Sequence, residues 1–275
     1  MIDFRTIYAM LFLVATLFSI KLNAADLKKA NLGVQNDTAK TAPISELQQY
    51  PNFFKKHIDA DGILIMGSDK VSDTSFVIAK SIVIKMLAKI PEVKKAMVNK
   101  HTQIILVAQN EEFSDIPEFK GFDVMRDEDG NILNKRLRGL SLAGKNLFMS
   151  CGEETLICSL SDSHRGENIF VHEFAHTIAN LGINAVDTTF LRTLKQIYNR
   201  AKNKQLWKNT YAIASFQEYF AEGVQCWFNV CRRSIPGDGV ANEISRRSEL
   251  KYYDPELFNL LSKYFYPDDS IKVCN

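Results

Sequence analysis

The chain has 275 residues, of which 46% are hydrophobic and 24% charged, and its formal net charge is +2. This is the composition of an ordinary globular protein with enough apolar side chains for a sizeable core. The basic residues are scattered along the sequence and form no stripe that would follow a phosphate backbone. Nucleic acid is therefore not expected as a partner.

Residues 1–24 predict a secretory signal peptide. Arg5 lies in a short leading segment, the run Tyr8 to Ile20 is uncharged and apolar, and Ala24 offers a small residue for cleavage. The alternative is a membrane anchor, but a bilayer span needs about 20 apolar residues and this run is shorter. We expect a protein secreted from the cell or into the periplasm, with no stable membrane anchor after cleavage.

The rest of the chain is predicted to contain a flexible leader followed by a single domain. Residues 25–43 are polar and aperiodic, which is typical of a flexible segment, and residues 44–275 carry the regular patterns. Strands are predicted over 62–67, over 103–108 and once or twice within 136–149; helices are predicted over 73–90, 92–100, 167–181, 188–204, 215–229 and 255–265. Together they indicate an α+β fold in which helices pack on a small mixed sheet.

Five cysteines fit an oxidising compartment. The sequence leaves several pairings open, and we favour a small loop closed by Cys151 and Cys158. No Cys-x-x-Cys spacing occurs, so the thiols are not expected to bind zinc. The cysteines are Cys151, Cys158, Cys226, Cys231 and Cys274.

The segment His172-Glu173-Phe174-Ala175-His176 has the His-Glu-x-x-His pattern. Residues four apart lie on one face of a helix, so both imidazoles can reach one zinc ion. Glu173 is next to the first ligand, where its carboxylate can accept a proton from a water molecule at the metal as general base. The alternative is a pair of core histidines without a metal.

A third ligand is required, because a catalytic zinc usually has three protein ligands and one open position. A metzincin would have Gly at 179 and His at 182, but these positions are Ala179 and Gly182, which excludes that class. Glu218 and Glu222 lie four apart in an otherwise apolar helical segment, where buried carboxylates need partners. One would bind the zinc, and the other could orient a histidine ligand.

Other interpretations of these residues stay open at this stage. Ser215 and Glu218 have the spacing of a helix capping box, which would explain Glu218 without a metal. Glu222 could be a surface glutamate. His57, His101 and His164 are expected to have surface or structural roles.

These motifs resemble the gluzincin metallopeptidases of the anthrax lethal factor type. In that family a His-Glu-Phe-x-His helix is followed by Tyr-x6-Glu-[Phe/Tyr]-Phe-Ala-Glu, and this chain has Tyr211 seven residues before Glu218, then Tyr-Phe-Ala-Glu. The strings RGENIFVHEFAHTI and QEYFAEGVQCWFN also resemble an uncharacterised group of secreted metallopeptidase-like proteins, from about Gly62 to Asp268. The resemblance implies a zincin-like fold, Glu218 as the third zinc ligand, and Tyr211 as a hydrogen-bond donor to the oxyanion.

The sequence therefore predicts a secreted zinc endopeptidase that acts on a protein or peptide, with one catalytic Zn²⁺ and Glu173 as general base. Two alternatives remain. One is a zinc amidase that acts on cell-wall or other non-peptide amides. The other is a secreted binding module that keeps zinc for stability and has no activity.

Overall fold

The computed structural model describes residue 50 and residues 52–119, 138–141 and 148–274. The predicted signal peptide (1–24) and leader (25–43) lie outside these residues. Among the described helices, none combines the length and the apolar character that crossing a membrane requires.

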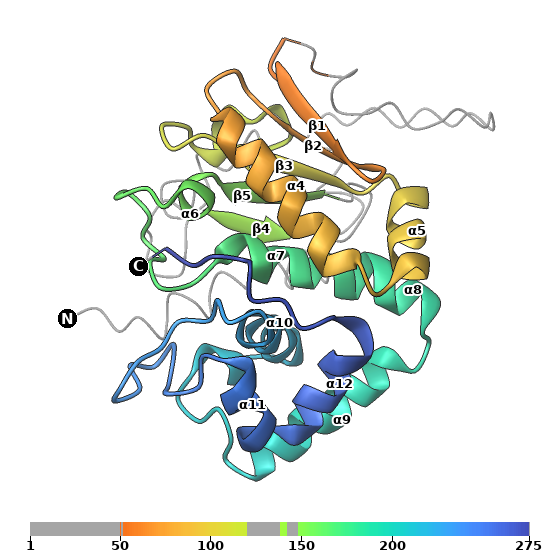
Figure 1. Cartoon of the computed structure of the whole chain (residues 1–275), viewed down its shortest axis with the longest axis vertical. Coiled ribbons are helices and arrows are strands. Elements are labelled where there is room, and N and C mark those ends of the chain that lie inside the picture. The colour runs from red at the N-terminus through yellow and green to blue at the C-terminus, as the bar shows by residue number, and fades with distance from the viewer. Residues whose placement is uncertain (1–49, 51, 120–137, 142–147, 275) are drawn as a thin grey trace, which may run out of the picture.

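A five-stranded mixed sheet occupies the upper half of the molecule in Figure 1, with strand order β1-β2-β3-β5-β4. The inner pairs β2–β3 and β3–β5 are parallel, and the two edge strands pair antiparallel to their neighbours. The strands are β1 (Lys56–Ala60), β2 (Ile63–Gly67), β3 (Gln103–Val107), β4 (Gly139–Ser141) and β5 (Phe148–Gly152).

The central strand β3 is buried on both faces, which explains its unbroken apolar sequence. Ile104 and Leu106 point into the main core that contains helix α4 (Asp73–Leu87), whereas Ile105 and Val107 point into a second cluster that contains Phe113. Alternate residues of a strand face opposite sides of the sheet, so one short run serves both cores.

The edge strand β1, with alternating exposed and half-buried residues, was not predicted from the sequence. β1 and β2 form a hairpin whose turn residues Asp61 and Gly62 have φ values of 55° and 94°. The Asp59 carboxylate accepts a hydrogen bond from the Gly62 amide at 3.0 Å. An Asp-Gly pair before an apolar run is a hairpin signal that the analysis did not use.

The predicted helices are confirmed to within a few residues, which confirms the α+β fold class. After Thr177, helix α7 (Ile169–Thr177) continues as a π-helical segment, Ile178–Ile183. The short helices α6, α8 and α11 were not predicted. The helices are α4 (Asp73–Leu87), α5 (Pro91–Asn99), α6 (Glu154–Ile157), α7 (Ile169–Thr177), α8 (Asn184–Val186), α9 (Phe190–Asn203), α10 (Phe216–Trp227), α11 (Arg247–Tyr253) and α12 (Pro255–Tyr264).

The lower half of the molecule is helical, with α10 surrounded by α9, α11 and α12 (Figure 1). The buried carboxylate of Asp254 connects several segments of this helical half through hydrogen bonds. It accepts hydrogen bonds from Trp207 Nε1 at 3.0 Å and from the Tyr219 hydroxyl at 2.6 Å, and it caps α12 through the Leu257 amide. Because Tyr219 is part of α10, this network fixes the position of that helix.

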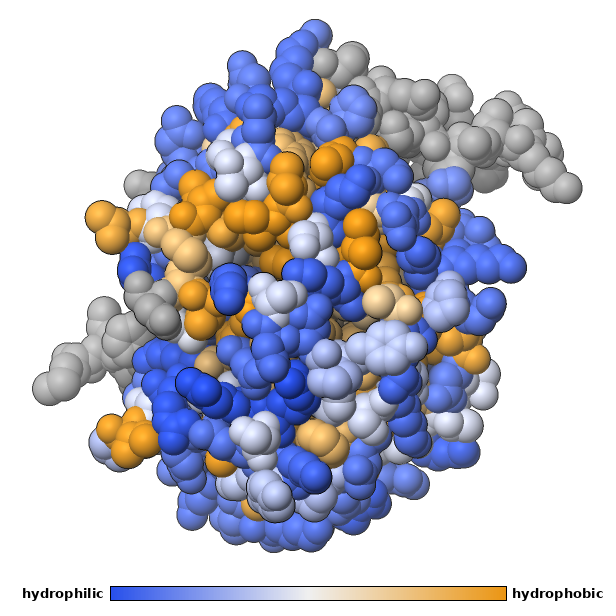
Figure 2. Space-filling view, viewed as in Figure 1, coloured by the Kyte–Doolittle hydropathy of each residue, from blue (hydrophilic) through white to orange (hydrophobic). Residues whose placement is uncertain are grey.

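The outer surface of the molecule differs between these halves. Figure 2 shows apolar side chains gathered over the region of α4, where Val77 is 62% exposed, while the surface over α11 and α12 is mainly hydrophilic. Nothing in the described residues covers the exposed side chain of Val77.

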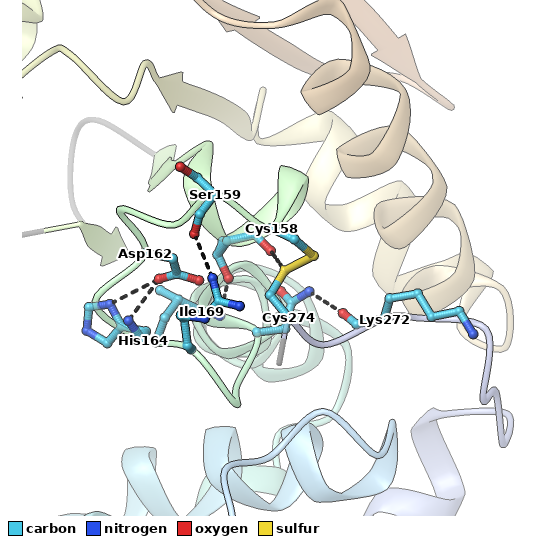
Figure 3. The surroundings of a disulfide bond; sticks show 10 residues. Cys158, Ser159, Asp162, His164, Ile169, Lys272 and Cys274 are labelled. Atoms are coloured by element: carbon cyan, nitrogen blue, oxygen red, sulfur yellow. Dashed lines mark hydrogen bonds and ion pairs between the residues drawn. A yellow bond between two sulfur atoms is a disulfide. The ribbon is translucent and has the colours of Figure 1, made fainter.

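One disulfide joins Cys158, at the end of α6, to Cys274 near the C-terminus (Figure 3). The preferred pairing of Cys151 with Cys158 was wrong. Cys151 lies on β5 with its side chain in the main core, whereas Cys158 follows α6 with φ of 56° and faces the C-terminal segment. The same segment is held by Asn168, whose Nδ2 donates to the Lys272 carbonyl at 3.0 Å.

We predict that replacing both Cys158 and Cys274 with serine lowers the free energy of unfolding by about 2–5 kcal/mol. The bond closes a long loop, with a sequence separation of 116, so its loss frees much of the unfolded chain. Guanidinium denaturation of the wild type and the double variant measures the change. An unchanged midpoint would contradict the structural role of this bond.

Candidate metal centre

The first half of the site lies on α7, which starts at a well-formed cap. Asn168 Oδ1 accepts a hydrogen bond from the Val171 amide at 3.1 Å, which satisfies one free donor of the first turn. His172 and His176 follow on one face of the helix, with their ring centroids 4.8 Å apart. Both side chains are buried.

The second half of the site lies on α10. Ser215 caps this helix, and its hydroxyl accepts a hydrogen bond from the Glu218 amide at 3.2 Å. The Glu218 carboxylate, however, turns away from the cap and meets the imidazoles. The interpretation of Glu218 as only the return half of a capping box is therefore wrong.

Three donor atoms converge between the two helices. Glu218 Oε2 lies 2.9 Å from His172 Nε2 and 3.5 Å from His176 Nε2, and the two Nε2 atoms are 3.1 Å apart. Zinc–ligand bonds of about 2.0–2.1 Å in a tetrahedron separate ligand atoms by roughly 3.3 Å. The triangle of donors therefore has the size that a single tetrahedral ion requires, and the donor set of two imidazoles and one carboxylate suits zinc.

The electrostatics of the site also favour a cation. Glu218 is fully buried, which opposes its charge, yet the neighbouring His176 and His172 lower the pKa of this carboxyl to about 2. Its other oxygen, Oε1, is buried and makes no hydrogen bond within the described part of the chain. A buried carboxylate with an unsatisfied oxygen is costly unless positive charge lies beside it.

Glu173 lies one position after His172 and is half-buried. Burial raises the pKa of this carboxyl, and the nearby His172 and His176 partly oppose the shift. The side chain rests against strand β4 at Gly139, where an added Cβ would lie 2.8 Å from Glu173 Oε1. The absence of a side chain at Gly139 therefore makes room for the Glu173 carboxylate.

Tyr211 lies in a short 3₁₀ turn, Tyr211–Ile213, just before α10. Its amide donates to the Val240 carbonyl at 2.8 Å, and its ring is stacked 6.1 Å from the ring of His172. Burial and the negative charges of Glu218 and Glu173 raise the pKa of Tyr211 well above its usual value. The phenol therefore stays protonated and able to donate a hydrogen bond.

Two further side chains contact Nδ1 of His172, the ring nitrogen that does not face the other two donor atoms. Its Nδ1 lies 3.1 Å from Gln225 Oε1 and 3.4 Å from Glu222 Oε1. Glu222 is 7% exposed, so the interpretation of it as a surface glutamate is wrong. Gln225 Nε2 donates to the Asn168 carbonyl at 3.1 Å, which fixes the orientation of the amide and leaves its oxygen toward His172.

The sequence analysis did not identify Gln225. The signal was present, because Glu218, Glu222 and Gln225 follow one another at helical spacings of four and three residues on one face of α10. A buried glutamine one turn beyond two buried carboxylates needs partners of its own. Gln225 is 0% exposed and finds them in His172 and Asn168.

The remaining histidines lie apart from the three donors. His57 on β1 and His101 in the turn before β3 are exposed. The His164 amide donates to Asp162 Oδ1 at 2.8 Å in the loop beside the disulfide (Figure 3), and burial lowers the pKa of its ring to about 4.

A comparison with protein-family models gives no match, and a comparison with curated proteins gives none. Among solved structures, the chain is similar to the PRO-PRO endopeptidase (PPEP-2) from Paenibacillus alvei. The two are 21% identical, with a TM-score of 0.49 over 74% of this chain and 97% of that chain.

We predict that Gln225→Leu lowers zinc affinity by about 10- to 100-fold, because His172 loses the acceptor that holds its Nδ1–H. Gln205→Leu is the matched control, since this glutamine is exposed in the turn after α9. It is expected to keep zinc affinity close to that of the wild type. Competition with a chromophoric chelator measures the affinities, and equal losses in both variants would contradict the orienting role.

We also predict that Glu167 makes stability depend on pH. Burial and the neighbouring Glu222 raise the pKa of this carboxyl to about 8. The unfolded chain ionises this group near its ordinary pKa of 4.5, so stability is full below that pH and is lost as pH rises through about 8.

Glu167→Gln should remove this dependence and stabilise the protein near pH 8 by on the order of a few kcal/mol, with little effect near pH 4.5. Urea denaturation at the two pH values tests it. A variant that shifts stability equally at both would show that Glu167 does not titrate in this range.

Proposed function

We propose that this protein is a zinc metallopeptidase of the gluzincin type, with a zincin-like fold and with His172, His176 and Glu218 as the zinc ligands. The observation that supports it most directly is the meeting of three buried donor atoms, from two helices, at separations of 2.9–3.5 Å. The resemblance of both helices to the lethal factor type supports the same assignment.

Zinc held by these residues would act as a Lewis acid, polarising a carbonyl and lowering the pKa of water toward about 7. Glu173 is the general base in this proposal. It accepts the proton of the attacking water and delivers it to the leaving amine as the peptide bond breaks.

Tyr211 acts on the other side of the scissile bond. Negative charge develops on the carbonyl oxygen during attack, and the protonated phenol donates a hydrogen bond to it. Donors of this kind typically contribute about 2.7–4 kcal/mol to the transition state. Glu222 and Gln225 take no part in the reaction and hold the ring of His172 in place.

The substrate class proposed is a protein or peptide outside the cytoplasm. The signal-peptide pattern of residues 1–24 and the disulfide between Cys158 and Cys274 support an extracellular or periplasmic location. Casein and peptidoglycan, tested as substrates side by side, distinguish the peptidase from a cell-wall amidase.

The non-catalytic alternative predicts a different zinc shell. Structural zinc is closed by four protein ligands, whereas catalytic zinc keeps one position open. Within the described residues, the cluster around His172 offers three ligating groups. This count favours an enzyme over a zinc-stabilised binding module.

We predict that Glu173→Gln binds one zinc per chain, unfolds at the same denaturant concentration as the wild type, and loses peptide hydrolysis. Its control is Glu92→Gln on the exposed face of α5, which should keep full activity. Cleavage of a peptide library, with zinc content measured in parallel, provides the test. Hydrolysis at wild-type rates by the Glu173 variant would rule out this mechanism.

A further inference from the structure

Cys226 and Cys231 are two buried thiols at the end of α10, and neither takes part in the disulfide of this structure. Their sulfur atoms lie 3.6 Å and 4.0 Å from the same acceptor, the Ile244 carbonyl oxygen. The nearby Cys226 thiol and burial raise the pKa of Cys231. The two side chains therefore share one small space.

The end of α10 brings these cysteines together. Asn229 has a φ of 61°, and the Val230 amide donates back to the Gln225 carbonyl at 2.9 Å. This is the reversal that commonly ends a helix. It returns the chain across the last turn, so that Cys231 lies beside Cys226.

The pair is connected to the metal centre through Glu222. The Cys231 thiol donates to Glu222 Oε2 at 3.6 Å, and the other oxygen of that carboxylate lies 3.4 Å from His172 Nδ1. Part of the charge of Glu222 is therefore directed to a thiol instead of to the histidine. The Glu222 carboxylate therefore links Cys231 to His172.

We propose that Cys226 and Cys231 are an oxidation site that closes to a second disulfide, and that closing it tightens zinc binding by releasing Glu222 from the Cys231 thiol. The effect on zinc rests on the function proposed above, whereas the cross-link does not. With its thiol donor gone, more of the charge of the Glu222 carboxylate is directed to His172, which makes Nε2 of that ring a stronger ligand.

The oxidant is a small-molecule disulfide such as oxidised glutathione. The thiolate of one cysteine attacks it, which forms a mixed disulfide and releases one small thiol. The thiolate of the second cysteine attacks the mixed disulfide, forms the Cys226–Cys231 bond and releases the second small thiol. The two protein protons end on these thiols. Because both cysteines are buried, the exchange takes place while the segment after α10 is open or has not yet packed.

Refolding in a glutathione redox buffer, followed by alkylation and non-reducing peptide mapping, tests the cross-link. We expect a peptide pair joined through Cys226 and Cys231, with Cys151 the remaining alkylated thiol of the three that are free in this structure. Cys151→Ser should leave the cross-link intact, and Cys226→Ser should make Cys231 reactive. Three alkylated thiols in the oxidised wild type, or a bond that includes Cys151, would overturn the proposal.

Zinc affinity tests the connection to the metal centre. The oxidised wild type and Cys226→Ser both keep the Cys158–Cys274 bond, so they differ at the proposed site. We expect zinc to bind roughly threefold to tenfold more weakly to Cys226→Ser, with Cys151→Ser unchanged as the matched control. In the Glu222→Gln background the difference should disappear. Equal affinities would overturn the connection, whereas no zinc binding in any variant, with the cross-link mapped as expected, would refute the zinc site alone.

Discussion

The central interaction of this molecule is the contact of the buried Glu218 carboxylate with two imidazoles. An ionised group in a site without water is tolerated only when charge and hydrogen bonds compensate for its lost hydration. Here His172 and His176 approach one oxygen, and the other oxygen is buried without a hydrogen bond in the described residues. A divalent cation at the centre of the three donors would balance this charge and use the geometry that the helices impose.

The fold serves to hold these two helices at that separation. On one side α7 packs against β4 and β5 of the sheet, and on the other side Asp254 anchors α10 to the helical half. Asn168 joins the two: its side chain caps α7 and holds the C-terminal segment, and its carbonyl accepts from Gln225 of α10. One buried asparagine therefore sets the start of the first helix and the position of the second.

The sequence was sufficient where local chemistry determines the structure. Apolar spacing predicted α7 and α10, and the His-Glu-x-x-His pattern led to His172 and His176. The paired carboxylates of α10 and the resemblance to the lethal factor type led to Glu218. It was insufficient where distant contacts decide. The disulfide partner of Cys158 is 116 residues away. Strand β1 carries too few apolar residues to be recognised from its sequence before it pairs with β2. Gln225 makes its hydrogen bond to Asn168 only when α10 lies against α7. The roles of Glu173 and Tyr211 remain predictions.

The most direct test of the account is a zinc-soaked crystal structure with anomalous diffraction collected at the zinc edge. We expect one ion bonded to Nε2 of His172, Nε2 of His176 and one carboxylate oxygen of Glu218, at about 2.0–2.2 Å, with a fourth position open toward Glu173. An ion bound elsewhere, or a fourth protein ligand that closes the shell, would contradict a catalytic zinc at this site.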